Sequence, residues 1–208
     1  MYQKAILLTL IFILPALGCQ KSSEKETNRS ENNSQKQKEL KSSNSNPNND
    51  SNPQAVVQML QHCLNGERQQ VTTLLDNGLP ADASDPQGQT CLMMASYNGH
   101  SDLVQMLIER GADIKKQNKQ GRTALMFAST GPFSTTVTAL LDAGADPNTT
   151  DNEEHWTPLM FAAAEGQQQV AEILLNNGAD PSLEDIDGDT ASDFAKNNNH
   201  DDLVELLK

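Results

Sequence analysis

Residues 157–181 read TPLMFAAAEGQQQVAEILLNNGADP, and this stretch carries the signals of two short helices. Thr157 stands where a helix N-cap is wanted, and Pro158 follows at the first helical position, where its missing N–H is harmless. Gly166 interrupts this first helix. A second helix with one apolar face is predicted by three residues at helical spacing, Val170, Ile173 and Leu174. Gly178 ends the second helix, because glycine readily adopts the left-handed conformation that closes many helices.

The same pattern recurs along most of the chain. The capping threonines are spaced by 33, 34 and 33 residues and are Thr90, Thr123, Thr157 and Thr190. The helix-ending glycines are spaced by 33, 33 and 34 residues and are Gly78, Gly111, Gly144 and Gly178. Self-similarity at this period is typical of solenoids. Two helices this short cannot bury an apolar face alone, so we expect successive units to stack and share one core.

The repeated units resemble ankyrin repeats, whose pattern is a Gly-Thr-Pro-Leu-His-Ala-Ala start followed by Val-x-x-Leu-Leu and Gly-Ala-Asp. Five successive units match over residues 54–208. The first, at residues 54–77, lacks the Thr-Pro-Leu start, and the last has Ser192 and Asp193 where the preceding unit has apolar residues. Polar end units suit the caps of a solenoid. We therefore predict an all-α solenoid of five ankyrin repeats, each a helix-turn-helix with a hairpin-like turn and the outer two modified.

The N-terminal residues resemble the export signal of a bacterial lipoprotein. Lys4 supplies positive charge, and residues 5–14 form an apolar run that is shorter than the roughly 20 residues needed to cross a bilayer. Gly18 precedes Cys19, as a small residue precedes the acylated cysteine of the lipobox, although the two residues before Gly18 depart from the usual order. We expect residues 1–18 to be a signal peptide and Cys19 to carry the lipid. Plain secretion and an uncleaved anchor are the alternatives.

Residues 20–53 are rich in Ser and Asn, and Leu40 is their only aliphatic or aromatic residue. Such a segment cannot bury enough apolar surface to offset its ordering entropy, so we predict that residues 19–53 comprise the lipidated cysteine and a disordered tether. Gln20 stands where some lipoproteins carry the Asp that retains them in the inner membrane. We therefore expect a protein of the bacterial cell envelope, lipid-anchored to a membrane. In a Gram-negative cell this would be the periplasmic side of the outer membrane.

Charge is distributed unevenly along the repeats. The whole chain has a formal net charge of −13, and residues 54–208 hold 8 Lys or Arg against 23 Asp or Glu. Five basic residues lie between Arg110 and Arg122, whereas residues 142–195 hold thirteen acidic residues and no Lys or Arg. An acidic surface of this kind repels phosphate backbones, so we expect no nucleic-acid ligand.

The other chemistry-bearing residues fit structural roles, and we expect no metal or cofactor. Apolar filler is the expected role of three methionines that stand where ankyrin repeats usually have His, namely Met93, Met126 and Met160. No pair of His residues has close zinc-ligand spacing, and the acidic run at residues 185–193 lacks the Gly and Glu positions of a calcium loop. Cys63 and Cys91 are offset by five residues between neighbouring repeats, roughly 7 Å along a helix axis. We therefore predict two buried thiols rather than a disulfide.

Repeat four has one additional residue in its leading turn, DNEEHWT, at residues 151–157. This turn carries His155 and Trp156, the only Trp in the chain. The ankyrin resemblance implies that the turn tips and the exposed side of the first helices form a concave binding face, where a Trp can anchor a partner. The alternative is a Trp that folds down over its own repeat. The candidate partner contacts, whose charged members would act as rim charges, are Tyr97, Lys119, Arg122, His155, Trp156, Glu165, Asp187 and Asp189.

Repeat three departs from the pattern at STGPFSTT, residues 129–136. Phe133 stands there in a turn that is normally polar. One interpretation is a different turn in which Phe133 packs locally. The other is an exposed apolar contact for a partner.

These features together predict a binding module. We expect a monomeric, lipid-tethered ankyrin protein that holds or inhibits a protein partner through its concave face, and not an enzyme. The sequence contains no glycine-rich phosphate loop, no metal-ligand cluster and no nucleophile motif. One alternative is an enzyme or metal-handling protein that uses His155, Glu153 and Glu154. Another is a passive spacer in the envelope.

Overall fold

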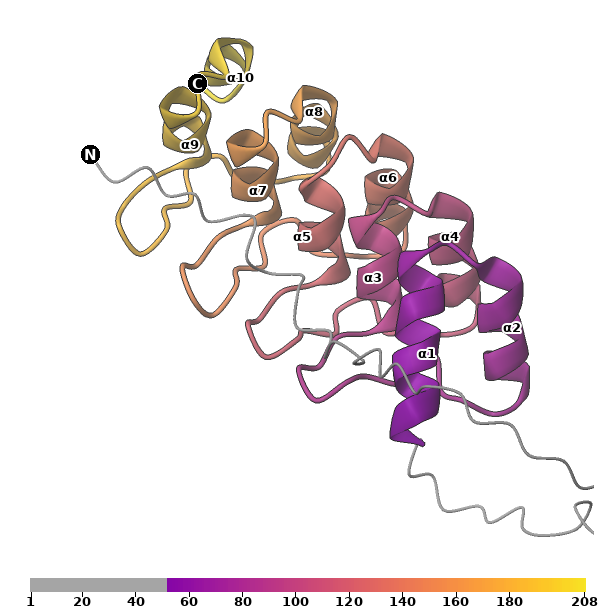
Figure 1. The fold of residues 1–208 in the computed structure, drawn as a ribbon. Helices are drawn as coiled ribbons and strands as arrows, with labels where there is room; N and C mark the ends of the chain where they lie inside the picture. Colours follow the sequence, from indigo (N-terminus) through magenta and orange to yellow (C-terminus); the bar gives the residue numbers. More distant parts are fainter. Residues whose placement is uncertain (1–51) are drawn as a thin grey trace, which may run out of the picture. The chain divides into compact units, whose positions relative to one another are not determined.

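The computed structural model describes residues 52–208, which form five consecutive pairs of helices (Figure 1). The first helices of the pairs are α1 (Pro53–Leu64), α3 (Cys91–Tyr97), α5 (Ala124–Ser129), α7 (Pro158–Ala164) and α9 (Ala191–Asn197). The second helices are α2 (Arg68–Asp76), α4 (Ser101–Glu109), α6 (Ser134–Asp142), α8 (Gln168–Asn176) and α10 (Asp201–Leu206). Apart from two isolated bridges, Ser84–Thr90 and Glu184–Thr190, these residues contain no strand. The predicted all-α solenoid of five repeats is confirmed.

The N-terminal predictions fall on a part of the chain that the structure does not describe. The predicted signal peptide, Cys19 and residues 20–51 of the predicted tether lie outside the described residues. Within residues 52–208, no helix is both long enough and apolar enough to span a membrane.

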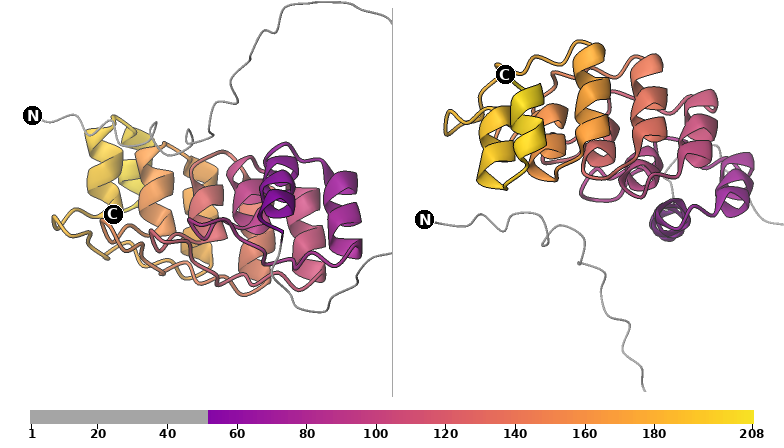
Figure 2. Two further views of the ribbon diagram at one scale, coloured as in Figure 1. Left: turned by 60° about the horizontal axis from the view of Figure 1, so that its bottom comes forward. Right: turned by 90° about the horizontal axis from the view of Figure 1, so that it is seen from above.

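The helices stack in two layers. Figure 2 shows the first helices side by side in one layer and the second helices in the other, both in the order of the chain. Contacts follow this order, since α3 packs on α5 and α4 packs on α6. Leucines fill much of the space between the layers, and the fully buried ones include Leu92, Leu107, Leu125, Leu140, Leu159 and Leu174. Each repeat therefore completes its core with its immediate neighbours, as expected of a quasi-one-dimensional fold.

The first helices of repeats two to five begin directly after threonines, as the sequence predicts, whereas Asn52 precedes α1. The Thr157 side-chain oxygen accepts a hydrogen bond from the backbone N–H of Met160 at 3.2 Å. The Met160 Sδ atom in turn accepts the Thr157 N–H at 3.3 Å, and Met126 does the same for Thr123. These methionines are buried, as expected of apolar filler, and they also take the place of the Glu in a capping box.

The prediction that the two cysteines of the repeats are free thiols is wrong, because Cys63 and Cys91 form a disulfide. Their Cα atoms are 5.4 Å apart. The prediction treated α1 and α3 as parallel rods that meet at equivalent residues. In the structure, the C-terminal end of α1, which holds Cys63, lies against Cys91, the first residue of α3. The first two repeats are thus displaced from the register that the sequence period suggests.

Phe133 packs locally, as the first of its two interpretations predicts. It precedes α6 and is half-buried, with its ring in the space that side chains at Gly99 and Gly131 would fill. His100 covers Gly66 and His200 covers Gly166 in the same way, at the equivalent position of their repeats. An aromatic or imidazole ring over the glycine of the preceding repeat is therefore a recurring packing device of this chain.

Candidate protein-interaction surface

The second to fifth repeats each begin with a turn whose tip projects beyond the first helix (Figure 1). We name tips two to five by their residues, which are 85–89, 118–122, 151–156 and 185–189. The first residue of each tip accepts two backbone N–H groups on its side-chain Oδ1 atom at distances of 2.8–3.1 Å. These four residues are Asp85, Asn118, Asp151 and Asp185. A short acceptor side chain at this position fixes the conformation of the tip.

Neighbouring tips are joined by backbone hydrogen bonds. The Lys119 N–H donates to the Gln87 carbonyl at 2.9 Å, which links tips two and three. Tips three and four are linked by Asn152 N–H to the Gln120 carbonyl at 2.8 Å, and tips four and five by Ile186 N–H to the Glu154 carbonyl at 3.1 Å. The four tips therefore form one continuous edge whose backbone is fixed before any partner arrives.

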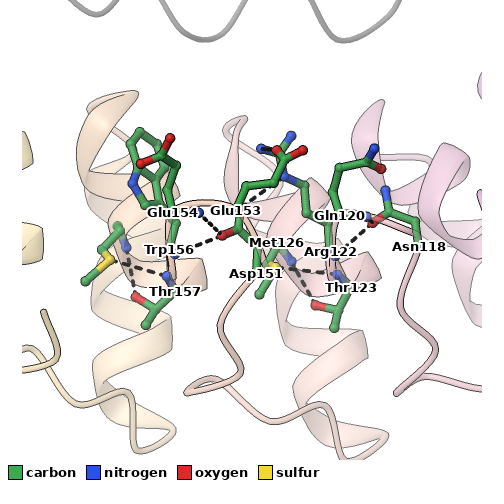
Figure 3. Close-up of polar contacts among 11 residues, drawn as sticks. Asn118, Gln120, Arg122, Thr123, Met126, Asp151, Glu153, Glu154, Trp156 and Thr157 are labelled. Carbon is green, nitrogen blue, oxygen red and sulfur yellow. Dashed lines mark hydrogen bonds and ion pairs between the residues drawn. The ribbon is translucent and has the colours of Figure 1, made fainter. Parts of the chain in front are cut away.

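Tip four accommodates its additional residue by a local bulge. In tips two and three, the carbonyl that accepts the hydrogen bond from the next tip belongs to the second residue after the Asx residue, Gln87 or Gln120. In tip four it belongs to the third residue after it, Glu154. Glu153 is thus the additional residue, and its side chain points toward tip three (Figure 3). His155 adopts a left-handed conformation with φ of 61°, at the position where the other tips have Gly88, Gly121 and Gly188.

The prediction that Arg122 is a rim charge available to a partner is wrong, because the residue is only 6 % exposed. Its Nε atom donates to Asp151 Oδ2 at 3.2 Å, and its Nη2 atom donates to Glu153 Oε2 at 3.3 Å (Figure 3). The guanidinium also lies over the Phe161 ring, 5.4 Å from its centre. Because Asp151 is buried as well, the charges compensate each other across the junction of repeats three and four.

The prediction that Trp156 is an exposed anchor is also wrong, because Trp156 is 5 % exposed. Its indole ring packs edge-on against Phe161 of its own repeat, with ring centres 5.2 Å apart, and against Phe194 of the next repeat at 4.4 Å. The alternative, a Trp folded down over its own repeat, describes the structure. Burying this large ring removes much apolar surface from water, so the folded-down position is more stable than an exposed position on an unbound tip.

Two phenylalanines that sequence reasoning did not select organise these junctions, and a third stands at the equivalent position of repeat three. Phe127, Phe161 and Phe194 occupy equivalent positions on α5, α7 and α9, and the last two are buried. The residue directly before a capping threonine packs against the phenylalanine of the following repeat, as Arg122 does with Phe161 and Trp156 with Phe194. Aligning GRTALMFAS, WTPLMFAAA and GDTASDFAK by their threonines would have shown these aromatic positions.

The remaining candidates divide into two groups. Lys119, His155 and Asp187 are exposed on the tips, and Asp189 is half-buried there. Tyr97 is the last residue of α3, at the end of the helix away from the tips, and packs edge-on against Phe127 at 6.2 Å. The structure therefore places Lys119, His155, Asp187 and Asp189 along the tip edge, and Tyr97 about one helix length away.

Glu165 belongs to the second group, since it follows α7 at the end away from the tips. It is half-buried, and this burial raises the pKa of its carboxyl, an effect that the nearby His200 partly opposes. A carboxyl that is partly removed from water interacts more strongly with an incoming positive charge than a fully solvated one does.

The alternative site of His155, Glu153 and Glu154 has a different geometry from a catalytic or metal cluster. The Glu153 carboxylate is directed at Arg122, while the His155 side chain is exposed. Residues 52–208 hold no group of three or more His, Cys, Asp or Glu placed to bind a metal ion.

Comparison with known proteins agrees with the repeat architecture. The sequence model of a family described as ankyrin repeats (3 copies) matches residues 59–151 and 129–208. No curated protein matches the sequence.

Proposed function

Because the chain belongs to the ankyrin-repeat family, we propose that it is a non-enzymatic module that holds or inhibits a protein partner through its tips and first helices. Ankyrin repeats are protein-interaction modules, and the finer assignment rests on the tip edge. Three backbone hydrogen bonds join four tips, each fixed by its own Asx residue. A surface that is ordered before binding loses little conformational entropy when a partner arrives. This fixed edge is the observation that carries the proposal.

We also propose that the module works in the bacterial cell envelope, anchored through a lipid on Cys19 and spaced from the membrane by residues 20–53. Support comes from the Cys63–Cys91 disulfide, because structural disulfides persist in oxidising compartments and are rare in the cytosol. Cys19→Ser should release the protein into the soluble fraction and abolish labelling by a fatty-acid probe. Labelling that persists in this variant would contradict the lipid anchor.

Capture of the partner from solubilised membranes tests the binding proposal. The full chain should retain a protein in stoichiometric amount, and Tyr97→Ala combined with Lys119→Glu should lose it. Gln105→Ala is the matched control, because Gln105 is exposed on α4, in the layer of second helices. Loss of the protein in the Gln105 variant but not in the paired variant would place the interface on the opposite layer. Absence of any stoichiometric protein from membranes would favour a passive spacer.

A further inference from the structure

The junctions on either side of repeat four place an Asp, a Phe and the residue before a capping threonine at equivalent positions. At the junction of tips three and four, Asp151 uses Oδ1 to fix its tip and Oδ2 to accept a hydrogen bond from Arg122 Nε. The guanidinium of Arg122 lies over Phe161. The equivalent residues at the junction of tips four and five are Asp185 and Phe194. Trp156 stands where the first junction has Arg122.

The second junction keeps the acceptor, but residues 142–195, which form its surroundings in the sequence, supply no Lys or Arg. Asp185 is 6 % exposed and fixes tip five through Oδ1, which accepts the N–H groups of Asp187 and Asp189 at 2.9 Å. Within residues 52–208, its Oδ2 atom is buried without a hydrogen-bond partner, and so is the Nε1 atom of Trp156. By the equivalence with Asp151, Oδ2 faces the preceding tip. A buried carboxylate oxygen without a partner is costly, so this arrangement calls for a donor.

The surroundings of this junction favour a positively charged donor. Residues 142–195 contain no Lys or Arg and thirteen acidic residues. Ile186 stands beside Asp185 at tip five and is 54 % exposed, which makes it one of two large apolar side chains so exposed in residues 52–208. Tip five has a neighbouring tip on one side and is linked to it by the Ile186 N–H to Glu154 carbonyl bond. Rotation of the exposed Ile186 side chain can therefore give a ligand access to this junction without breaking the backbone bond between the tips.

We propose that the junction of tips four and five binds an arginine side chain of the partner protein, whose guanidinium donates to Asp185 Oδ2 and stacks on the Trp156 indole. The bound guanidinium takes the role that Arg122 has one repeat earlier, with Ile186 contacting the apolar stem. Arginine suits this position better than lysine, because its planar group can stack on an aromatic ring and donate to a carboxylate at once. This inference deepens the proposed function and rests on it.

Trp156 reports on this junction directly, because it is the only Trp in the chain. The probe is a hexa-arginine peptide, added to the full chain while the Trp156 fluorescence and indole N–H resonance are followed. A hexa-citrulline peptide has nearly the same shape without the charge. We expect a saturable change with arginine and none with citrulline.

Asp185→Asn is the decisive variant. The side chain of Asn118 already fixes tip three through Oδ1, accepting two N–H groups at 3.0 and 2.9 Å, so Asn at position 185 should keep the tip folded. We expect it to weaken binding of hexa-arginine about tenfold, because a charge-assisted hydrogen bond is lost. Asp142→Asn removes the same charge from an exposed residue at the end of α6 and should change the affinity less than twofold.

Three results would overturn the proposal. Equal weakening by both variants would mean that the peptide responds only to net charge. An unchanged Trp156 signal would place the peptide elsewhere. An indole resonance that moves on Asp185→Asn and ignores the peptide would mean that Trp156 and Asp185 satisfy each other within the chain.

The membrane-derived partner separates this inference from the proposed function. A partner that binds the parent but loses about tenfold in affinity to Asp185→Asn supports both. A partner that binds Asp185→Asn and the parent equally leaves the binding module intact and refutes the arginine site. If no partner is captured, the proposed function fails regardless of how hexa-arginine binds.

Discussion

The junction of repeats three and four and the junction of repeats four and five occupy the same place in the repeat and are held together differently. Arg122 closes the first through an ion pair with Asp151, whereas Trp156 closes the second by packing between Phe161 and Phe194. Both residues directly precede a capping threonine. A single position of the repeat can therefore carry either electrostatic or apolar closure, provided that an aromatic ring from the next repeat lies beside it.

The difference has an energetic consequence. The apolar junction gains from the surface that Trp156 removes from water, but it leaves Asp185 Oδ2 without a hydrogen-bond partner among residues 52–208. The ionic junction satisfies both of its buried charged groups and gains less, because desolvating charges offsets much of their attraction. Variants at the two positions should therefore differ in size and in how they can be rescued.

The largest effect is expected for Trp156→Ala. Removing a buried indole that contacts two rings leaves a cavity and should lower the free energy of unfolding by about 3–5 kcal/mol. Trp156→Phe keeps an aromatic ring at this position and should lose less than half of that. Urea unfolding followed by circular dichroism measures both variants. A Trp156→Ala protein as stable as the parent would show that the indole does not hold this junction.

A smaller loss is expected for Arg122→Met, about 3 kcal/mol, because it leaves the Asp151 carboxylate buried without its counter-charge. Adding Asp151→Asn should restore about 1–2 kcal/mol, since the uncompensated charge disappears while Oδ1 still fixes the tip. The same unfolding experiment gives the coupling. Glu153→Gln is the control and should change stability by less than about 1 kcal/mol, because the Glu153 side chain is 52 % exposed. Additive losses in the double variant would contradict a buried ion pair.

The repeat period of the sequence predicted most of the fold correctly. Thr90, Thr123 and Thr157 cap helices as predicted, because an N-cap is a local property of a few consecutive residues. The stacking of five pairs follows from the period, because each unit meets only copies of itself. These parts of the fold depend on short-range order, which a single sequence displays directly.

The candidate site was harder to predict, because it depends on contacts between repeats. Trp156 and Arg122 resemble surface residues when their turns are read alone, and only the phenylalanines of the next repeat show what covers them. The Cys63–Cys91 disulfide was missed for a related reason. Its geometry depends on how α1 leans on α3, and the sequence period contains no information about such a displacement.

The smallest effect is expected in tip four, where His155→Gly should stabilise the protein. His155 has a φ of 61°, a conformation that costs a residue with a Cβ about 1 kcal/mol and that the other tips assign to glycine. The greater freedom of glycine in the unfolded chain offsets part of this gain, so we expect a net increase of about 0.5 kcal/mol in the free energy of unfolding. His155→Ala is the control, because it removes the imidazole and keeps the strained backbone, and it should give no increase. If alanine stabilises as much as glycine, the imidazole rather than the backbone is the source of the cost. If His155 contacts the partner, capture of the partner from membranes will weaken in both variants, although only the glycine variant gains stability. This outcome would distinguish a binding role for the His155 side chain from its structural role in tip four.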